Sequence, residues 1–346
     1  MKKILILTLT MITLIMGDVL AQKKKNKGPK EITEKEINWK GGYNQKKFNK
    51  APKKIYISKF NVYFHVIASA TAKTSGGRTL GGGSVRAATS TTMTVAVDGV
   101  DVPDFQKITD EAYNRFVSDL EAQGFEFIST EEAAKTEYYA DWTLKDGGEV
   151  NYANIPGYVS VTPTGTKYMI KKETKKGREK STFVDKTMIL SGELDDALIA
   201  EVTLAFPAID MDADGGVYAA TSKVKANVNY RMASAYGADG LTSVYANNMV
   251  KFVSGKGPGL TADAYYMVSL KEPVGSDKAV FKDTEFKERN TGSTSPMYYG
   301  IVFKDNEGST ATHTTTADHD LYVSESQRLI NEFLDLTMAD FFSYYK

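Results

Sequence analysis

Cysteine is absent from all 346 residues of this chain, and histidine occurs only three times. Without thiols the chain can form no disulfide, no thiolate metal site and no cysteine nucleophile. The histidines, His65, His313 and His319, lack close metal-ligand spacing, so a zinc site is not expected. Neither a Gly-x-Ser-x-Gly elbow nor a His-Glu-x-x-His motif is present. We therefore predict no catalytic residue and no cofactor, and we do not expect an enzyme.

Long apolar runs are also scarce after the first residues. Residues 1–21 combine two early lysines, an apolar stretch from Ile4 to Met16 and a small-residue end at Val19-Leu20-Ala21. This order is typical of a cleaved secretory signal, and the apolar stretch is too short to span a bilayer comfortably. We expect an exported protein. The absence of disulfides favours the bacterial periplasm or outer membrane.

Charge is balanced overall, with 43 basic and 43 acidic residues, but it is unevenly distributed. Residues 22–54 contain twelve lysines and three glutamates, so the remainder of the chain is acidic. We predict a flexible basic arm, 22–54, before a single α/β body, 55–346. The arm is either a solvated linker or a peripheral contact with anionic lipid headgroups or cell-wall polymers. A nucleic-acid partner is not expected.

The first part of the body has the clearest pattern of secondary structure. Residues 55–67 carry apolar side chains on both faces, which is typical of a central strand covered on two sides. A second strand is predicted over 91–97. A helix follows from Pro103 to Gln123, with Asp101 as its N-cap and apolar residues at helical spacing. Residues 125–128 then return as a strand, and Ser129 with Glu132 has the spacing of a capping box.

The later chain predicts several more strands and a closing helix. The expected elements are strands or hairpins in 158–170, 202–206, 220–232, 266–270 and 299–303, a short helix within 191–199, and a helix from Asp320 or Ser324 to Tyr345. Alternation of apolar and polar residues in 220–232 indicates a half-buried antiparallel strand. The predicted class is α+β (α/β-like), with a mixed, mostly antiparallel sheet flanked by two main helices.

Three carboxylates form the only metal-like pattern. Asp210, Asp212, Asp214 and Gly215 match the first half of an EF-hand calcium loop. The twelfth position would be Thr221, which cannot supply the bidentate carboxylate of that motif. The carboxylates are therefore either a calcium site or a solvated turn between strands.

A glycine-rich loop at 76–83 lacks the Gly-Lys-Ser/Thr ending of a phosphate loop and reads as a hairpin tip. Its flanks, 67–75 and 84–97, are of a length that could cross a membrane as a hairpin. However, the face that would meet lipid in 67–75 offers Ile67, Ser69, Thr71 and Lys73. This face is too polar for hydrocarbon, so we expect the loop to stay in water and the protein to be peripheral.

Two other functions stay open at this point. The aromatic residues and acidic body would suit an envelope-glycan hydrolase or a carbohydrate-binding module, for which two facing carboxylates would be needed. Acidic pairs such as Asp195-Asp196 are common on exposed loops, so no catalytic pair is named. The other function is a calcium-binding module using the three aspartates above.

The order of elements resembles the periplasmic domain of the curli-secretion channel family and related TolB N-terminal-like domains. The resemblance rests on the strand 55–64, the helix 108–120, the return 124–128 and the closing helix 324–345. It implies an α/β domain at the outer membrane, assembly into rings and non-catalytic secretion work. This chain lacks the lipidated cysteine of that family, so we transfer no functional residue. The function expected is a non-catalytic envelope protein that associates with itself or with an envelope partner.

Overall fold

The fold is given by a computed structural model that describes residues 29–75, 77–78, 85–86, 88–180, 185–215, 222–234, 247–281, 287–288 and 311–345. The predicted signal 1–21, most of the predicted glycine loop 76–83 and the predicted strand 299–303 lie outside these ranges.

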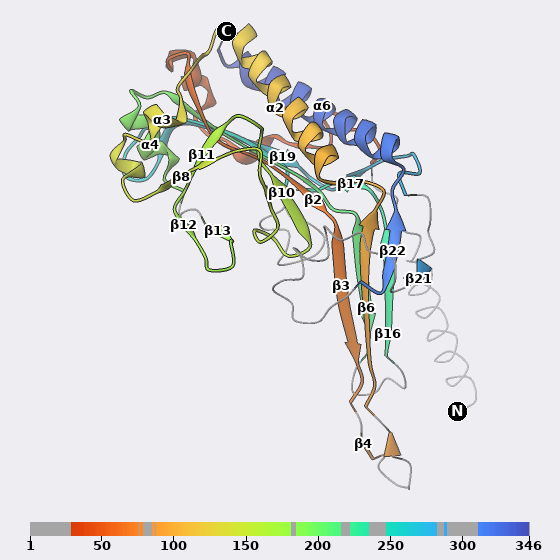
Figure 1. The fold of residues 1–346 in the computed structure, drawn as a ribbon. Helices are drawn as coiled ribbons and strands as arrows, with labels where there is room; N and C mark the ends of the chain where they lie inside the picture. Colours follow the sequence, from red (N-terminus) through yellow and green to blue (C-terminus); the bar gives the residue numbers. More distant parts are fainter. Residues whose placement is uncertain are drawn as a thin grey trace, which may run out of the picture.

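An eight-stranded mixed sheet lies at the centre of the body (Figure 1). Its strands are β1 (Ile37–Asn38), β2 (Lys54–His65), β7 (Glu126–Phe127), β9 (Val150–Asn151), β10 (Tyr158–Val161), β14 (Leu198–Phe206), β18 (Met249–Lys256) and β19 (Ala262–Leu270). They follow the order β1-β19-β18-β14-β2-β10-β9, with β7 beside the start of β2. β2 pairs in parallel with β14 and β7, and the other neighbours are antiparallel. The predicted α+β class and mostly antiparallel sheet are therefore confirmed.

Two long helices, α2 (Val102–Ala122) and α6 (His319–Ser343), cover one face of the sheet, which we call the first face (Figure 1). Both ends of α2 lie within one residue of the predicted helix, and the Asp104 carboxylate accepts a hydrogen bond from the Asp101 N–H at 3.0 Å. The α6 helix begins at His319 because the Asp318 side chain accepts from the Leu321 N–H at 3.3 Å. The predicted start at Ser324 is therefore wrong, and the alternative at Asp320 is off by one residue.

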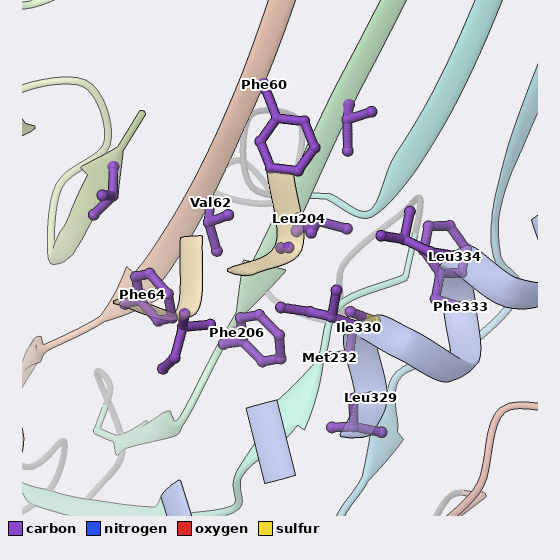
Figure 2. Close-up of a cluster of buried hydrophobic side chains, with 14 of the residues drawn as sticks. Phe60, Val62, Phe64, Leu204, Phe206, Met232, Leu329, Ile330, Phe333 and Leu334 are labelled. Carbon is purple, nitrogen blue, oxygen red and sulfur yellow. The ribbon is translucent and has the colours of Figure 1, made fainter. Parts of the chain in front are cut away.

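The main hydrophobic core fills the space between the first face and these helices (Figure 2). Its centre is formed by Phe60, Val62 and Phe64 of β2, Leu204 and Phe206 of β14, Met232, and Leu329, Ile330, Phe333 and Leu334 of α6. Alternate strand residues and helix residues three to four apart share one face, so the apolar pattern of the sequence becomes one continuous core. Burying each of these large side chains contributes about 1.5–3 kcal/mol.

The second face of the sheet carries a smaller core under three short helices. These are α3 (Thr130–Ala133), η3 (Glu137–Tyr139) and α4 (Thr187–Glu193). They pack on Tyr56, Ile199 and Val253. The short helix predicted within 191–199 is wrong, because α4 ends at Glu193 and Leu198 already begins β14. An apolar run of this length does not by itself distinguish a helix from a buried strand.

Several short strand pairs surround the sheet. They are β8 (Thr143–Asp146) with β11 (Lys167–Ile170), β12 (Lys172–Glu173) with β13 (Glu179–Lys180), and β17 (Arg231–Met232) with β20 (Val274–Gly275). Within the predicted 158–170 hairpin, β10 and β11 are both present but belong to different sheets.

The segment predicted as a flexible basic arm is folded over the range that the structure describes, residues 29–54. It contains β1 and the 3-10 helices η1 (Trp39–Gly41) and η2 (Gln45–Lys50). Ile37 pairs with Leu270 at the edge of the sheet. Phe48 is fully buried, with its ring 5.3 Å from that of Phe341. The predicted boundary at residue 55 is therefore wrong, because the apolar residues between the lysines anchor this segment to the body.

A group of strands projects from the body, and we call it the arm (Figure 1). Its first hairpin is β3 (Ile67–Lys73) with β6 (Ser90–Asp98), extended by β4 (Gly77–Arg78) and β5 (Val85–Arg86), and its second is β15 (Ile209–Asp214) with β16 (Lys223–Val228). β22 (His313–Thr316) pairs with β6 in parallel, and β21 (Lys287–Glu288) pairs with β22 in the antiparallel direction. The predicted strand 91–97 lies in this arm. The predicted strand 220–232 is confirmed in part, because residues 223–228 form β16 of the arm, whereas residues 231–232 form β17 and residues 220–221 lie outside the described ranges.

Substituting Phe48 tests whether residues 29–54 belong to the folded body. We expect Phe48→Ala to lower the free energy of unfolding by about 3–5 kcal/mol, because the change leaves a cavity under α6. Urea titration of the mature chain measures this, with Lys50→Ala, an exposed neighbour, as the control that stays near wild type. Equal stability of Phe48→Ala and wild type would show that residues 29–54 do not pack on the body and would favour the predicted flexible segment.

Candidate functional site

The arm has its root where two parallel strands of the main sheet end. β2 and β14 are neighbours, and Phe64 lies opposite Phe206 at their C-terminal ends. The chain leaves β2 into β3 and leaves β14 into β15. Because the strands are parallel, both exits lie at the same edge of the sheet, so the two hairpins start side by side.

The two hairpins contact each other along the arm. The Thr91 Oγ1 of β6 lies 2.7 Å from the Ser222 Oγ, just before β16. At the far end of β15, a Cβ on Gly215 would lie 2.6 Å from the Lys73 carbonyl oxygen. A glycine is needed there because the two backbones approach so closely. The contacts therefore hold the hairpins together from their root to this point.

Polar and apolar residues of the arm lie on opposite faces of each hairpin. Ala68, Met93, Met211 and Ala226 are partly buried against the main core. The opposite face of the first hairpin carries hydroxyl pairs across the strands, with Ser69 Oγ and Thr71 Oγ1 each 2.9 Å from the threonine opposite. Asp212, Lys225, Asp214 and Lys223 alternate on the corresponding face of the second hairpin, and all four are exposed. The described outer surface of the arm is thus polar, whereas its inner surface is apolar.

His65 connects the roots of both hairpins. It lies at the end of β2, is 7 % exposed, and stacks on the Tyr158 ring with 4.4 Å between centroids. Its Nε2 lies 3.0 Å from the Ile67 carbonyl oxygen at the start of β3. Its Nδ1 accepts from the N–H groups of Ala208 and Ile209, at 3.3 and 3.4 Å, at the start of β15. A neutral ring with its proton on Nε2 satisfies all of these contacts at once.

Burial lowers the pKa of His65 to about 4, and the nearby positive charge of Arg231 acts in the same direction. The hydrogen bond to Ile67 and the negative charge of Asp210 act in the opposite direction but do not cancel the effect of burial. Protonation of Nδ1 would also remove the acceptor for the β15 backbone. The hydrogen bonds that link the starts of the two hairpins therefore depend on a neutral imidazole.

The first of the three predicted calcium ligands has a different partner. The guanidinium of Arg231, 6 % exposed, donates to both carboxylate oxygens of Asp210, with one distance of 2.9 Å. Asp210, Asp212 and Asp214 lie on a strand and not in a turn, at alternate positions of β15. Alternate strand residues are about 6.6–6.8 Å apart, whereas calcium ligands lie 2.3–2.6 Å from the ion.

One calcium ion could not be bound by all three carboxylates in this conformation. Among the described residues no group of three or more histidine, aspartate or glutamate side chains is placed to hold a metal ion. The calcium site stays a prediction without geometric support. Gly215, the fourth residue of the EF-hand-like match, is explained by its close approach to β3.

A charged cluster on the second face bears on the hydrolase alternative. The Lys251 ammonium, 5 % exposed, lies 2.9 Å from the Asp185 carboxylate and 2.8 Å from that of Glu201. Burial opposes the charged form of Lys251, but the two carboxylates outweigh it and raise its pKa. Burial likewise opposes ionisation of Asp185, but Lys251 and Thr187 lower its pKa. A general acid needs a raised carboxyl pKa, so the lowered pKa of Asp185 makes this cluster unsuited to glycoside hydrolysis.

The acidic pair Asp195-Asp196 also has a structural explanation. Both residues have positive φ angles, 56° and 59°, and the Ala197 N–H donates to the Leu194 carbonyl at 3.1 Å. This is a tight turn between α4 and β14, for which aspartate tolerates the left-handed conformation. Asp195 borders an open hollow of about 450 Å³ that is lined by charged side chains of both signs and by Phe127. We assign the hollow no ligand.

Comparison with known proteins finds no matching family model, and no curated protein or solved structure matches the chain significantly. The resemblance to the curli-secretion channel family therefore stays a hypothesis. Within the described residues no helix is long and apolar enough to cross a membrane.

Lowering the pH should decrease the free energy of unfolding, because the buried His65 ring resists protonation in the folded chain. The unfolded chain binds the proton near pH 6.5, whereas the folded chain resists it down to about pH 4. The stabilisation is complete above pH 6.5 and is lost as the pH falls to 4, with a total of about 3 kcal/mol. Urea titrations from pH 7 to pH 4 should show that the wild-type advantage over His65→Gln shrinks with falling pH.

His319 supplies a control of the opposite sign. Hydrogen bonds from its ring to Asp320 and Asp104 raise its pKa, so any stabilisation is present below pH 6.5 and lost as the pH rises. The advantage of wild type over His319→Gln should therefore not shrink on acidification. If the difference in unfolding free energy between wild type and His65→Gln stays constant across this pH range, the neutral imidazole does not stabilise the contact between the two hairpins.

Proposed function

We propose that this protein is a non-catalytic cell-envelope protein, located in the periplasm or at the outer membrane, that assembles with copies of itself or with an envelope partner. The observation that carries the proposal is the arm, which places two hairpins outside the α/β body (Figure 1). The predicted secretory signal at 1–21 supports the location, and the resemblance stated above supports the role.

The strand order of the arm supports assembly. β3 is the last strand of the sheet β21-β22-β6-β3, and β15 lies beside it, with Gly215 against the Lys73 backbone. The two hairpins are separate sheets with no hydrogen-bond ladder between them among the described residues, and strands with incomplete ladders can accept a strand from another chain. The arm also has charges of both signs on its outer face, which can match a partner and disfavour others. Among the described residues, no comparable feature supports a function as a hydrolase, a carbohydrate-binding module or a calcium-binding module.

Assembly through the arm can be tested by cross-linking, because the chain contains no native cysteine. Thr71→Cys places one thiol on the exposed face of β3, and Asn114→Cys places one on the exposed side of α2. Under mild oxidation at micromolar concentration, we expect covalent dimers from Thr71→Cys and few from Asn114→Cys. Disulfides form only when two Cα atoms approach within about 7 Å, so random collisions contribute little.

Light scattering on the wild-type mature chain completes the assembly test, with a mass above that of the monomer expected. A monomeric mass, equal cross-linking of both variants and no partner in an envelope pull-down would together refute the proposal.

The same proposal predicts a peripheral protein. The described outer face of the arm is polar, and a charged side chain such as Lys73 at the bilayer midplane would cost about 2–4 kcal/mol. Washing isolated membranes with high salt or carbonate should therefore release the protein into the supernatant, as detected by immunoblot. Retention in the pellet after both treatments would show that the segments around the glycine loop enter the membrane.

A further inference from the structure

Lysines and two exposed non-polar side chains gather at the end of the body opposite the arm. We call Tyr43, Lys46, Lys47, Lys50 and Leu260 the basic face. We propose that the basic face docks on an anionic lipid headgroup layer. The inference deepens the proposed function, on which it rests for the presence of an envelope membrane.

The lysines of the basic face lie on η2, which is fixed to the body by the buried side chain of Phe48. Phe48, in the middle of η2, is fully buried against Phe341 and Tyr345, with ring centroids 5.3 and 6.2 Å away. Lys46 and Lys50, two residues on either side of Phe48, are exposed to solvent. The short helix therefore presents its cations outward while its aromatic residue fixes it to α6. A rigid cation cluster loses less entropy on binding than a disordered tail does.

Two apolar groups lie beside these lysines. The Tyr43 Oη accepts from the Ala262 N–H at 3.0 Å, and its ring stacks on Tyr265 with 5.2 Å between centroids. Leu260 is two residues before Ala262, in the turn between β18 and β19, and is 56 % exposed. Lys47 forms an exposed ion pair with Asp263 of the same strand, at 3.4 Å, so Lys46 and Lys50 supply most of the net positive charge of the face. These contacts place Tyr43, Lys47 and Leu260 in one neighbourhood.

The combination favours a lipid surface over a soluble polymer. Lysines near an anionic bilayer are attracted to its headgroups, and tyrosine is enriched at the membrane–water interface. An exposed leucine at a turn tip gains by entering the acyl boundary, whereas a polyanion in water offers it no apolar environment. The acidic turn Asp195-Asp196 lies at the same end but follows α4 on the second face. Its charge would tilt the body so that η2, and not α4, meets the lipid.

The position of the basic face agrees with a free arm. η2 packs on the last turn of α6, whereas β22, which leads into α6, belongs to the arm. A helix of 25 residues is about 37 Å long, so the basic face and the arm lie at opposite ends of α6. Docking through η2 would therefore leave the arm directed away from the headgroups and available to a partner.

The test uses the mature chain and vesicles of phosphatidylcholine with or without phosphatidylglycerol. We expect sedimentation with the anionic vesicles, and a loss of affinity of about tenfold or more in Lys46→Gln/Lys47→Gln/Lys50→Gln. The matched control is Lys107→Gln/Lys172→Gln/Lys175→Gln, three exposed lysines from α2 and the β12–β13 hairpin, which should bind like wild type. An environment-sensitive dye on Leu260→Cys should shift to shorter wavelength on binding, and the same dye on Asn114→Cys should not.

Several results would overturn the docking proposal. They are equal binding by the two lysine variants, loss of binding only when Lys23, Lys24, Lys25 and Lys27 are replaced, or no binding by wild type. Binding to a soluble polyanion as tight as to vesicles, without a dye shift on Leu260→Cys, would assign the face to a polymer. Cross-linking through Thr71→Cys is measured separately on the lysine variant. Loss of vesicle binding with intact cross-linking isolates docking from assembly, and the reverse outcome would count against assembly alone.

Discussion

The parallel pairing of β2 with β14 is the constraint on which the rest of the structure depends. It aligns nine residues of β14 with β2, from Leu198 opposite Ile55 to Phe206 opposite Phe64. Both strands are buried on both faces, and a slip by one residue would exchange the side chains that pack in the two different cores, so the packing fixes their register. Their shared direction then brings two hairpins, distant in sequence, to one edge of the sheet. The arm follows from this pairing and from the joint at His65.

Buried charged side chains lie on both faces of the main sheet. On the first face, the fully buried Glu325 of α6 lies 2.7 Å from both Lys278 and Arg328. Burial alone would raise the pKa of Glu325, but Arg328, Lys278 and the Ser276 hydroxyl lower it to about 2. On the second face, Lys251 bridges two carboxylates. Buried pairs of this kind add little net stability, but breaking one leaves an uncompensated charge, so they disfavour other packings.

The sequence predicts elements well where local signals decide and fails where distant contacts decide. Helix α2 and the central strand are found because apolar periodicity and caps are local properties. The sequence does not predict the folded segment 29–54, because eight lysines dominate its composition, whereas Ile37 and Phe48 are anchored by β19 and α6, more than 200 residues away. His65 was recognised only as a strand residue. A histidine in an otherwise apolar strand is the signal that could have drawn attention to it.

The partners of Lys251 and Arg231 could not be predicted, because each pair joins residues whose contact depends on strand order. Glu201 meets Lys251 only because β14 and β18 are neighbours. Asp210 meets Arg231 only because the chain after β16 returns to the root of the arm. The three aspartates look like a metal motif in one dimension. In the structure their spacing is that of a strand with its charged side outward.

Charge is unevenly distributed between the two hairpins of the arm. Residues 37–97 contain no acidic residue, so β3 and the hairpin that begins there carry only cations as charged groups before Asp98. The second hairpin brings Asp210, Asp212 and Asp214 to the same arm. Within one chain the arm therefore sets a purely cationic hairpin beside one that carries carboxylates, so the contact between the two hairpins is electrostatically matched.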